Sequence, residues 1–170
     1  MSENIEVMWE GRFITAKREG KWEYVSRSRG IKAAVILAID DGHVLLVEQF
    51  RVPLGKYCIE LPAGLVGDHD ENAEEDSAIA AIRELEEETG YRAETMEDCG
   101  EYYSSPGMVS ESFSLFRASG LTKVGDGGGV DGENIVVHRV ALSGLTDFIE
   151  NKRSEGAGID VKLLMFLQLA

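Results

Sequence analysis

The chain has 170 residues, of which 44% are hydrophobic and 28% charged, and this is the size and balance of one compact domain that can bury a core. This composition excludes a disordered chain, and the lack of a fixed internal period excludes a repeat array. With 17 basic and 31 acidic residues the formal charge is -14, so we expect neither nucleic acid nor an anionic membrane as a partner.

The beginning of the chain and its cysteines indicate the compartment. Residues 1–6 have no basic start followed by an apolar stretch, so we expect no signal peptide. The longest apolar run, 33–39, is too short to span a bilayer. Cys58 and Cys99 show no metal-ligand spacing and are expected to be reduced thiols. These features predict a cytoplasmic protein.

The first part of the chain indicates strands. Polar and apolar residues alternate over 5–28, which predicts a β-hairpin or a pair of short strands. The apolar run 32–39 predicts a buried strand, and the Asp-Gly turn after it makes 43–50 its hairpin partner. A further strand is expected at 57–61, before a loop that opens at 62–64.

A helix is expected over 74–89, ended by Gly90, because its apolar residues recur at helical spacing: Ala78, Ile79, Ile82 and Leu85. We expect these four residues to form its buried face.

The rest of the chain mixes both kinds of element. Strands are expected near 100–103, 111–118 and 135–142, a flexible glycine-rich loop at 125–132, and helices at 144–152 and 160–169. The last helix is expected to pack on the core through Val161, Leu164, Phe166 and Leu167. Strands around one central helix predict a mixed α/β domain.

The expected central helix ends in an unusual concentration of acid. Segment 68–88 holds ten carboxylates and one base, Arg83. Glu84, Glu87 and Glu88 lie at i, i+3 and i+4, where like charges repel by about 0.2–0.5 kcal/mol per pair. They also sit at the negative end of the helix dipole. One interpretation is a solvated acidic face, and the other is a site for hard divalent cations such as Mg²⁺, which prefer carboxylate oxygens.

The spacing of fixed residues favours the second interpretation. The run from Arg83 to Tyr91 reads R-E-L-E-E-E-T-G-Y, and Glu75 precedes Arg83 by the interval of seven intervening residues. This pattern resembles the Nudix signature, G-x5-E-x7-R-E-U-x-E-E-x-G-U, in which U is a bulky apolar residue. Ten residues, rather than the five of the signature, lie between its glycine, Gly64, and Glu75, which we interpret as an insertion in the loop between them.

The resemblance implies a Nudix α/β/α sandwich with a mixed β-sheet over residues 30–170. In that family the signature forms a loop, a helix and a loop that hold Mg²⁺, with Mn²⁺ as a substitute. By resemblance, Glu84, Glu88 and the carbonyl of Ala63 would be metal ligands, and Glu87 would be a further ligand or a partner through water. Arg83 would form a salt bridge that orients Glu75 or Glu84.

Two further segments resemble the ADP-ribose pyrophosphatase subfamily. One runs from Arg51-Val-Pro to Glu60-Leu-Pro-Ala-Gly, and it implies substrate-binding roles for Arg51 and Glu60. The other is Ser104-Ser-Pro-Gly followed by a segment similar to a mobile catalytic loop, which would make Glu111 the general base. Glu133, in the glycine-rich loop, is a further candidate for approach to the substrate.

The N-terminal extension, 1–29, resembles the strand region through which these enzymes dimerise. The resemblance implies a homodimer, with Trp22 stacking on the nucleobase and Arg27 reaching the substrate. A lone tryptophan in a hairpin is also compatible with simple packing. His138 is interpreted as an ordinary strand residue.

The function that follows is Mg²⁺-dependent hydrolysis of the pyrophosphate bond of ADP-ribose or a related nucleoside diphosphate sugar. The alternatives are hydrolysis of GDP-mannose or another nucleotide sugar, and a non-catalytic Nudix module that binds a nucleotide. A calcium-binding protein is a third alternative, but no EF-hand spacing occurs.

Overall fold

The structure is a computed structural model that describes residues 5–28, 31–67, 76–130 and 132–166, without the side chains of 165 and 166. Its strands are β1 (Glu6–Glu10), β2 (Ile14–Glu19), β3 (Trp22–Arg27), β4 (Lys32–Asp40), β5 (His43–Arg51), β6 (Lys56–Glu60), β7 (Ala63–Val66), β8 (Tyr91–Arg92), β9 (Thr95–Tyr103), β10 (Ser112–Ser119), β11 (Thr122–Lys123), β12 (Val136–Ala141) and β13 (Gly158–Ile159). Its helices are α1 (Ser77–Thr89), α2 (Leu145–Ser154) and α3 (Val161–Phe166), with 3-10 turns at Val52–Leu54 and Leu142–Gly144.

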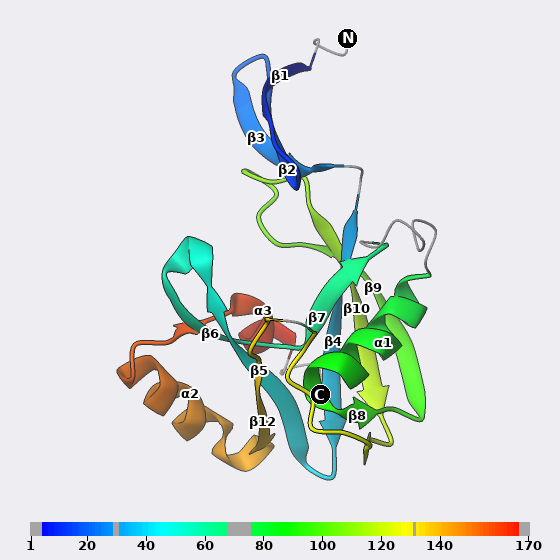
Figure 1. Cartoon of the computed structure of the whole chain (residues 1–170). Helices are drawn as coiled ribbons and strands as arrows, with labels where there is room; N and C mark the ends of the chain where they lie inside the picture. Colours follow the sequence, from blue (N-terminus) through cyan, green and yellow to red (C-terminus); the bar gives the residue numbers. More distant parts are fainter. Residues whose placement is uncertain (1–4, 29–30, 68–75, 131, 167–170) are drawn as a thin grey trace.

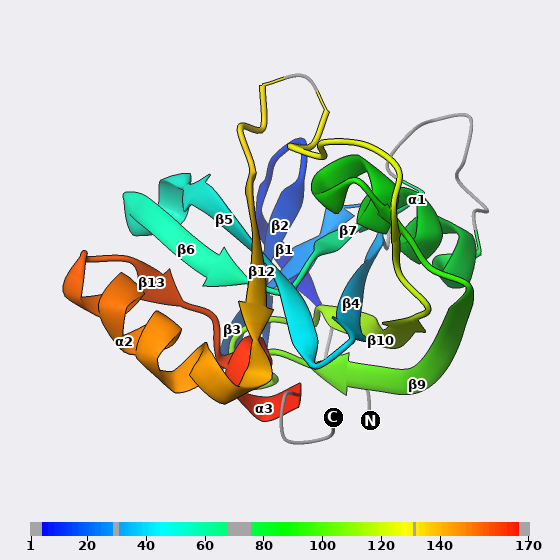
Figure 2. The ribbon, with the colours of Figure 1, turned by 90° about the horizontal axis from the view of Figure 1, so that it is seen from below.

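A mixed sheet separates α1 from α2 and α3, as Figures 1 and 2 show. Strand β4 is buried on both faces and divides its side chains between two cores. Ala34, Ile36 and Ala38 join the core under α1, whereas Val35 and Leu37 join the core under α2 and α3. This alternation follows from the two-residue period of a strand. The expected α/β/α sandwich is therefore confirmed.

The sheet splits at its centre. Strands β4 and β5 pair only next to their turn, through Ile39 with Val44 and Asp40 with His43. Beyond that point β4 pairs with β10 and β7, while β5 pairs with β6 and β12. The expected hairpin is thus confirmed at the turn, and its two strands then diverge. The divergence leaves the far ends of β4 and β5 on opposite sides of an opening.

The N-terminal extension is a separate sheet of three strands in the order β1-β2-β3, where the sequence analysis expected two. It projects from the sandwich in Figure 1. Its edge strand is tied to the loop before β10, because the Val25 N–H donates to the carbonyl of Met108 and the Ser110 N–H donates to that of Val25, both at 2.9 Å.

The central helix corrects two expectations. It begins at Ser77, not at residue 74, because the carboxylate of Asp76 caps it by accepting the Ala78 N–H at 2.8 Å. Leu85 is buried and Ala78 packs against the same core, as expected, but Ile79 and Ile82 are 60% and 44% exposed, so the expectation is wrong for the two isoleucines. The buried residues of the helix are Ala80, Ala81, Leu85, Glu88 and Thr89. Small residues let the helix lie close to the sheet, and this rotation carries one glutamate inward.

Three other expectations change. Residues 63–66, expected in a loop, form β7, which pairs with β4. In α3 the buried residue is Leu163, while Val161 and Leu164 are exposed; the expected contacts of Phe166 and Leu167 lie outside the described side chains. The loop at 125–132, expected to be flexible, is hydrogen-bonded to the end of α1 in its described part. In the described part of the chain, no helix is long and apolar enough to cross a membrane.

Candidate active site

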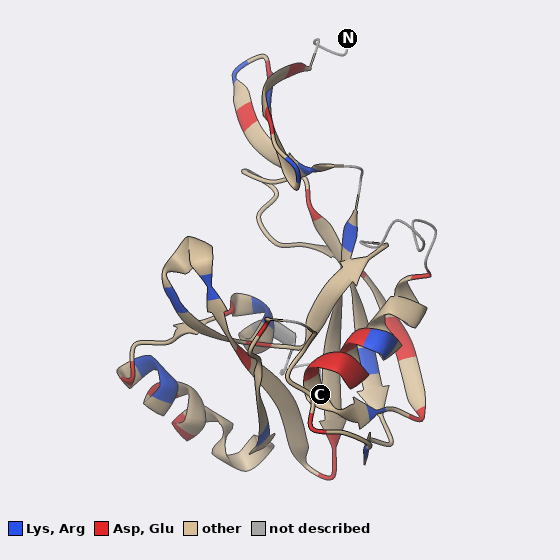
Figure 3. Cartoon of the chain, in the orientation of Figure 1, with Lys and Arg blue, Asp and Glu red and all other residues tan. Residues whose placement is uncertain are grey.

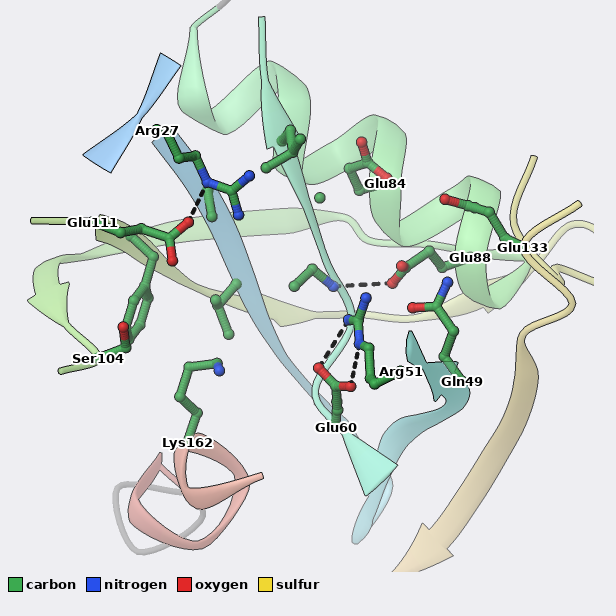
Figure 4. Close-up of a pocket in the computed structure, with 16 residues that line it drawn as sticks. Arg27, Gln49, Arg51, Glu60, Glu84, Glu88, Ser104, Glu111, Glu133 and Lys162 are labelled. Atoms are coloured by element: carbon green, nitrogen blue, oxygen red, sulfur yellow. Dashed lines mark hydrogen bonds and ion pairs between the residues drawn. The ribbon is translucent and has the colours of Figure 1, made fainter. Parts of the chain in front are cut away.

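A cavity of about 410 Å³ occupies the opening between the diverging strands. It brings together most of the residues that the sequence analysis proposed for the site. Figure 4 shows the acidic side chains of α1 on one side and an arginine and glutamate pair across from them. The proposed residues that line the cavity are Arg27, Arg51, Glu60, Ala63, Glu84, Glu88, Glu111 and Glu133.

Helix α1 supplies an acidic wall, which Figure 3 shows as red on its ribbon. Glu88 is only 5% exposed, and its Oε2 accepts the Ala63 N–H at 2.9 Å. Burial, together with the nearby carboxylates of Glu84 and Glu133, raises the pKa of Glu88 to about 8 against the opposing effect of this hydrogen bond. A cation placed here would reverse this balance by stabilising the charged carboxylates.

The position of Glu84 depends on a glycine in the neighbouring strand. A Cβ built on Gly64 would lie 1.9 Å from Cδ of Glu84, so any larger residue would displace that carboxylate. Arg83 fixes the carboxylate from the helix side, because its Nη1 lies 2.8 Å from Oε1 of Glu84. The same nitrogen lies 3.0 Å from Oε2 of Glu87. Arg83 and Glu87 therefore support this wall without lining the cavity. Glu75 lies outside the described residues.

Basic side chains face the cavity from three other elements. Arg51, at the end of β5, donates two hydrogen bonds to Glu60, at 2.6 and 2.9 Å, and this contact raises the pKa of the guanidinium. Arg27, at the end of β3, pairs with Glu111. Lys162 reaches the cavity from α3, where it pairs with Asp160. Each cation is thus held in place by an acid and can present its remaining donors to an anion.

Glu133 enters the cavity from the loop between β11 and β12. Its Oε2 accepts the Val130 N–H at 3.0 Å. Figure 4 places it on the side of Glu84 and Glu88, away from Glu111. Besides the carboxylates of α1 and Glu60, which holds Arg51, the cavity therefore has Glu133 on one side and Glu111 on the other.

Trp22 is the proposed substrate-binding residue that the single chain does not bring to the cavity. Its side chain is 60% exposed and lines a different hollow, of about 520 Å³, between β3 and the loop at 106–110.

Sequence reasoning missed Gln49 and Lys162, and it quoted Ser104 only within a motif, although all three line the cavity. The position of Gln49 could have been predicted from the two-residue period of a strand, because Gln49 precedes Arg51 by two residues and its side chain lies on the same face of β5. No local sequence motif indicates that Lys162 lines the cavity, because only the tertiary fold places its helix near β10.

The donors in this cavity fit a divalent cation. In the described ranges no three His, Cys, Asp or Glu side chains are gathered closely enough to hold an ion by themselves. Mg²⁺ does not require such a cage, because it is bound by one or two carboxylates together with waters and substrate phosphates. Glu84, Glu88 and the backbone of Ala63 offer oxygen donors of this kind at the cavity wall.

A mixed α/β sandwich with a glutamate-bearing signature helix defines the class of protein. The NUDIX domain model matches residues 29–145, and the chain belongs to the Nudix family. Among its relatives, an uncharacterised Nudix hydrolase of Schizosaccharomyces pombe is 38% identical in an alignment that covers 85% of this chain and 75% of that protein.

Two relatives with named activities are also similar. An ADP-ribose pyrophosphatase of Bacillus subtilis is 35% identical over 70% of this chain and 62% of its own length. A GDP-mannose pyrophosphatase of Cronobacter sakazakii is 33% identical over 99% of this chain and 89% of its own length. The crystal structure of an ADP compounds hydrolase matches the fold with a TM-score of 0.69 and 22% identity, covering 88% of this chain and 82% of that one.

Proposed function

We propose that this Nudix hydrolase cleaves the pyrophosphate bond of ADP-ribose or a related nucleoside diphosphate sugar, releasing a nucleoside monophosphate and a sugar phosphate. The observation that carries the proposal is one cavity with carboxylates from α1 on one side and arginines on the other. Such a cavity suits a diphosphate that arrives with a divalent cation. The relatives named for ADP-ribose and GDP-mannose support a substrate of this class.

The cation in this proposal is Mg²⁺, with Mn²⁺ as a substitute. Glu84, Glu88 and the carbonyl of Ala63 would hold it, and Glu87 would act through water. A divalent cation polarises phosphoryl oxygens and lowers the pKa of bound water. The protein itself keeps these oxygens in place, because Arg83 forms ion pairs of 2.8 Å with Glu84 and 3.0 Å with Glu87.

The phosphates would be bound by the basic side chains across the cavity. Glu60 holds the guanidinium of Arg51 through two hydrogen bonds, so its remaining N–H groups have a fixed direction. Arg27 and Lys162 would contribute further positive charge from β3 and α3. Because an acidic side chain already holds each of these basic side chains in place, their donors are oriented before the substrate binds.

Two carboxylates compete for the role of general base. The resemblance assigns it to Glu111, whose carboxylate forms an ion pair with Arg27. The carboxylate of Glu133 accepts a hydrogen bond from the Val130 N–H and lies on the side of Glu88. The geometry therefore favours Glu133 as the base and gives Glu111 a role in orienting Arg27.

The decisive experiment measures release of nucleoside monophosphate from ADP-ribose, GDP-mannose and other nucleotide sugars, with Mg²⁺, Mn²⁺ or chelator. We expect activity only with the divalent ion and its abolition in Glu88→Gln, which keeps a hydrogen-bond acceptor for Ala63 and so preserves the fold. Undiminished turnover in chelator, or by Glu88→Gln, would refute the proposed role of these residues.

The general base is identified by comparing two variants. We expect Glu133→Gln to lower kcat by about 10²-fold or more, the usual contribution of a positioned base, with little effect on KM. Glu111→Gln is expected to act more on KM, through Arg27. The reversed pattern would restore Glu111 to the role that the resemblance assigns to it.

The two alternatives have different outcomes in the same assay. Preference for GDP-mannose would agree with the similarity to the GDP-mannose pyrophosphatase, 89% of whose length aligns with this chain. The proposed mechanism would be unchanged. A non-catalytic module would bind nucleotide sugars and return them intact. The full acidic set on α1 favours catalysis, since a binding module has no need of it.

We also propose a homodimer formed through the extension 1–29. Trp9, Phe13 and Trp22 are each more than half exposed on this small sheet, which is unusual for large apolar side chains. Because Trp22 does not line the cavity of its own chain, stacking on the nucleobase would require a second copy. The free thiols of Cys58 and Cys99 support the further proposal of a cytoplasmic location, which cell fractionation would test.

A further inference from the structure

The glycine-rich loop after β11 closes the C-terminal end of α1. The Gly128 N–H donates to the carbonyl of Glu88 at 2.8 Å, and the Gly129 N–H donates to that of Glu87 at 3.0 Å. The last carbonyls of a helix have no partner within it, so these bonds satisfy acceptors that would otherwise need water. The loop is therefore attached to the turn of α1 that carries the acidic residues.

The same loop sets the position of Glu133. The Val130 N–H donates to Oε2 of Glu133 at 3.0 Å, and the Glu133 N–H donates to the carbonyl of Val130 at 3.1 Å. A further bond of 3.1 Å runs from the Ile135 N–H to the carbonyl of Gly128. The carboxylate that enters the cavity is thus held by the loop backbone, and the loop backbone is held by α1.

Two of the loop glycines are required for close approach. A Cβ on Gly129 would lie 2.2 Å from Oε2 of Glu133, and one on Gly127 would lie 2.6 Å from the carbonyl oxygen of Glu88. Gly128 and Gly132 differ, because a Cβ on Gly128 would be 3.8 Å from its nearest neighbour and one on Gly132 would have none within 4 Å. All four have φ between +69° and +110°, so a side chain strains the backbone at each of them.

We propose that this loop is a positioning element that couples Glu133 to the acidic end of α1, and that Gly129 is the positioning residue for the carboxylate of Glu133. The inference rests on the proposed function only for its effect on turnover. The closest collision at Gly129 is with the carboxylate end of the Glu133 side chain, while Cβ of Glu133 and Cδ1 of Ile135 would each lie at 3.0 Å. We therefore expect an added methyl group to move the carboxylate first and to leave the loop bonds to α1 in place. At Gly127 the collision is with backbone, and the helix end itself would have to move.

The test compares Gly129→Ala with Gly128→Ala. Both variants put alanine at a positive φ, and we expect similar losses of thermal stability. Only Gly129→Ala displaces Glu133, and a misplacement of about 1 Å at a reacting group can cost about 10²-fold. We therefore expect a large fall in kcat for Gly129→Ala and a small one for Gly128→Ala. Equal falls would overturn the assignment.

A double variant shows whether the effect passes through Glu133. If Gly129→Ala acts only by moving that carboxylate, it lowers the activity of Glu133→Gln by far less than it lowers that of the native enzyme. An undiminished effect of Gly129→Ala in the Glu133→Gln background would show that the residue has a general structural role, which contradicts the proposal.

Amide hydrogen exchange, followed by NMR, gives a readout that needs neither substrate nor metal. The Val130 amide is protected by the carboxylate of Glu133, so we expect it to exchange faster in Gly129→Ala and in Glu133→Ala, but not in Gly128→Ala. The amides of Gly128 and residue 129, bonded to α1, are expected to keep their protection in Gly129→Ala. Unchanged protection of Val130 in that variant would refute the inference, even if the protein had no activity on nucleotide sugars.

Discussion

At the scale of single residues, Gly64 shows how a strand determines the position of the Glu84 carboxylate in the candidate site. The backbone of β7 passes so close to α1 that a Cβ would lie 1.9 Å from Cδ of Glu84. Gly64 does not need its freedom of backbone angle here, since no positive φ occurs at this position. Its lack of a side chain leaves the space that the Glu84 carboxylate occupies.

Gly64→Ala is therefore expected to weaken metal binding while the fold persists. The added methyl group pushes the Glu84 carboxylate away from Glu88, and disturbance of a metal ligand's support usually costs about 10- to 100-fold in affinity. The measurement is activity against Mg²⁺ concentration, with the melting temperature recorded in parallel. Gly107→Ala is the control, because a Cβ there meets nothing within 4 Å. An unchanged Mg²⁺ requirement in Gly64→Ala would separate Glu84 from metal binding.

At the scale of elements, the face of α1 that packs against the sheet also carries a glutamate of the candidate site. Its buried residues Ala81 and Leu85 share a face with Glu88, which they precede by seven and three residues, respectively. The helix therefore presents its last glutamate to the sheet and to the cavity at once, while two isoleucines remain exposed. Burial of an acid on the packing face is costly without a partner, so the position of Glu88 favours a functional role for this end of the helix over a role in solubility.

Truncations on the two sides of α1 test this orientation. Leu85→Ala removes a side chain with no exposure and leaves a cavity, so we expect a loss of about 2–5 kcal/mol in the free energy of unfolding. Ile79→Ala, at 60% exposure, is expected to change it far less. Urea denaturation of both variants gives the comparison. A loss for Ile79→Ala as large as that for Leu85→Ala would mean that Ile79 is buried against the sheet, as the sequence pattern first indicated.

The extent of prediction from sequence differs between elements for physical reasons. The signature spacing located α1, its acids and Gly90 because these are local properties of the chain. The orientation of α1 was missed because two alanines pack against the sheet in place of two larger isoleucines, and hydrophobicity alone favours the larger residues. Strand β7 was missed because its pairing with β4 outweighs the weak strand preference of its sequence.

The site shows the same division. Arg51, Glu60 and Glu111 belong to short motifs and were found, whereas Lys162 reaches the cavity from a distant helix and has no local signal. The conformation of the glycine-rich loop was also not predictable, since the loop is held by hydrogen bonds to the end of a distant helix, such as the bond from the Gly128 N–H to the carbonyl of Glu88, 40 residues earlier. Resemblance to the family covered the signature and left these tertiary relations undetermined.

At the scale of the whole molecule, Glu48 joins three elements on the side of the sheet opposite α1. Its Oε2 lies 2.8 Å from Nε2 of His138, in β12, and 2.9 Å from Nζ of Lys152, in α2. Burial by itself would raise the pKa of Glu48, but hydrogen bonds from Lys152 and His138 prevail and lower it below its ordinary value of 4.5. The same contact raises the pKa of Lys152, whose other acidic neighbour is Glu155.

This network gives a pH dependence of stability with a defined sign. A lowered carboxyl pKa stabilises the fold above the ordinary value of 4.5 and loses that contribution as the pH falls below it. Glu48→Gln should therefore cost about 1–3 kcal/mol near neutral pH and progressively less in acid. The control is Glu101→Gln, an exposed partner of Lys32 whose loss should be small. Parallel curves of unfolding free energy against pH for Glu48→Gln and the native protein would contradict this account.

The projecting N-terminal sheet leads to the last prediction, which concerns assembly. Phe13 is 65% exposed and Trp22 60%, and neither is covered by the sandwich of its own chain. If these side chains are buried between two copies, light scattering should give the mass of a dimer, and Phe13→Asp should give a monomer. Val52→Asp is the matched control, since Val52 is 80% exposed on the hairpin between β5 and β6, outside the extension. If the same dimer also brings Trp22 to the partner's cavity, the monomeric variant should bind nucleotide more weakly although its own cavity is intact. A native protein that remains monomeric at high concentration would remove both the dimer and the stacking role of Trp22.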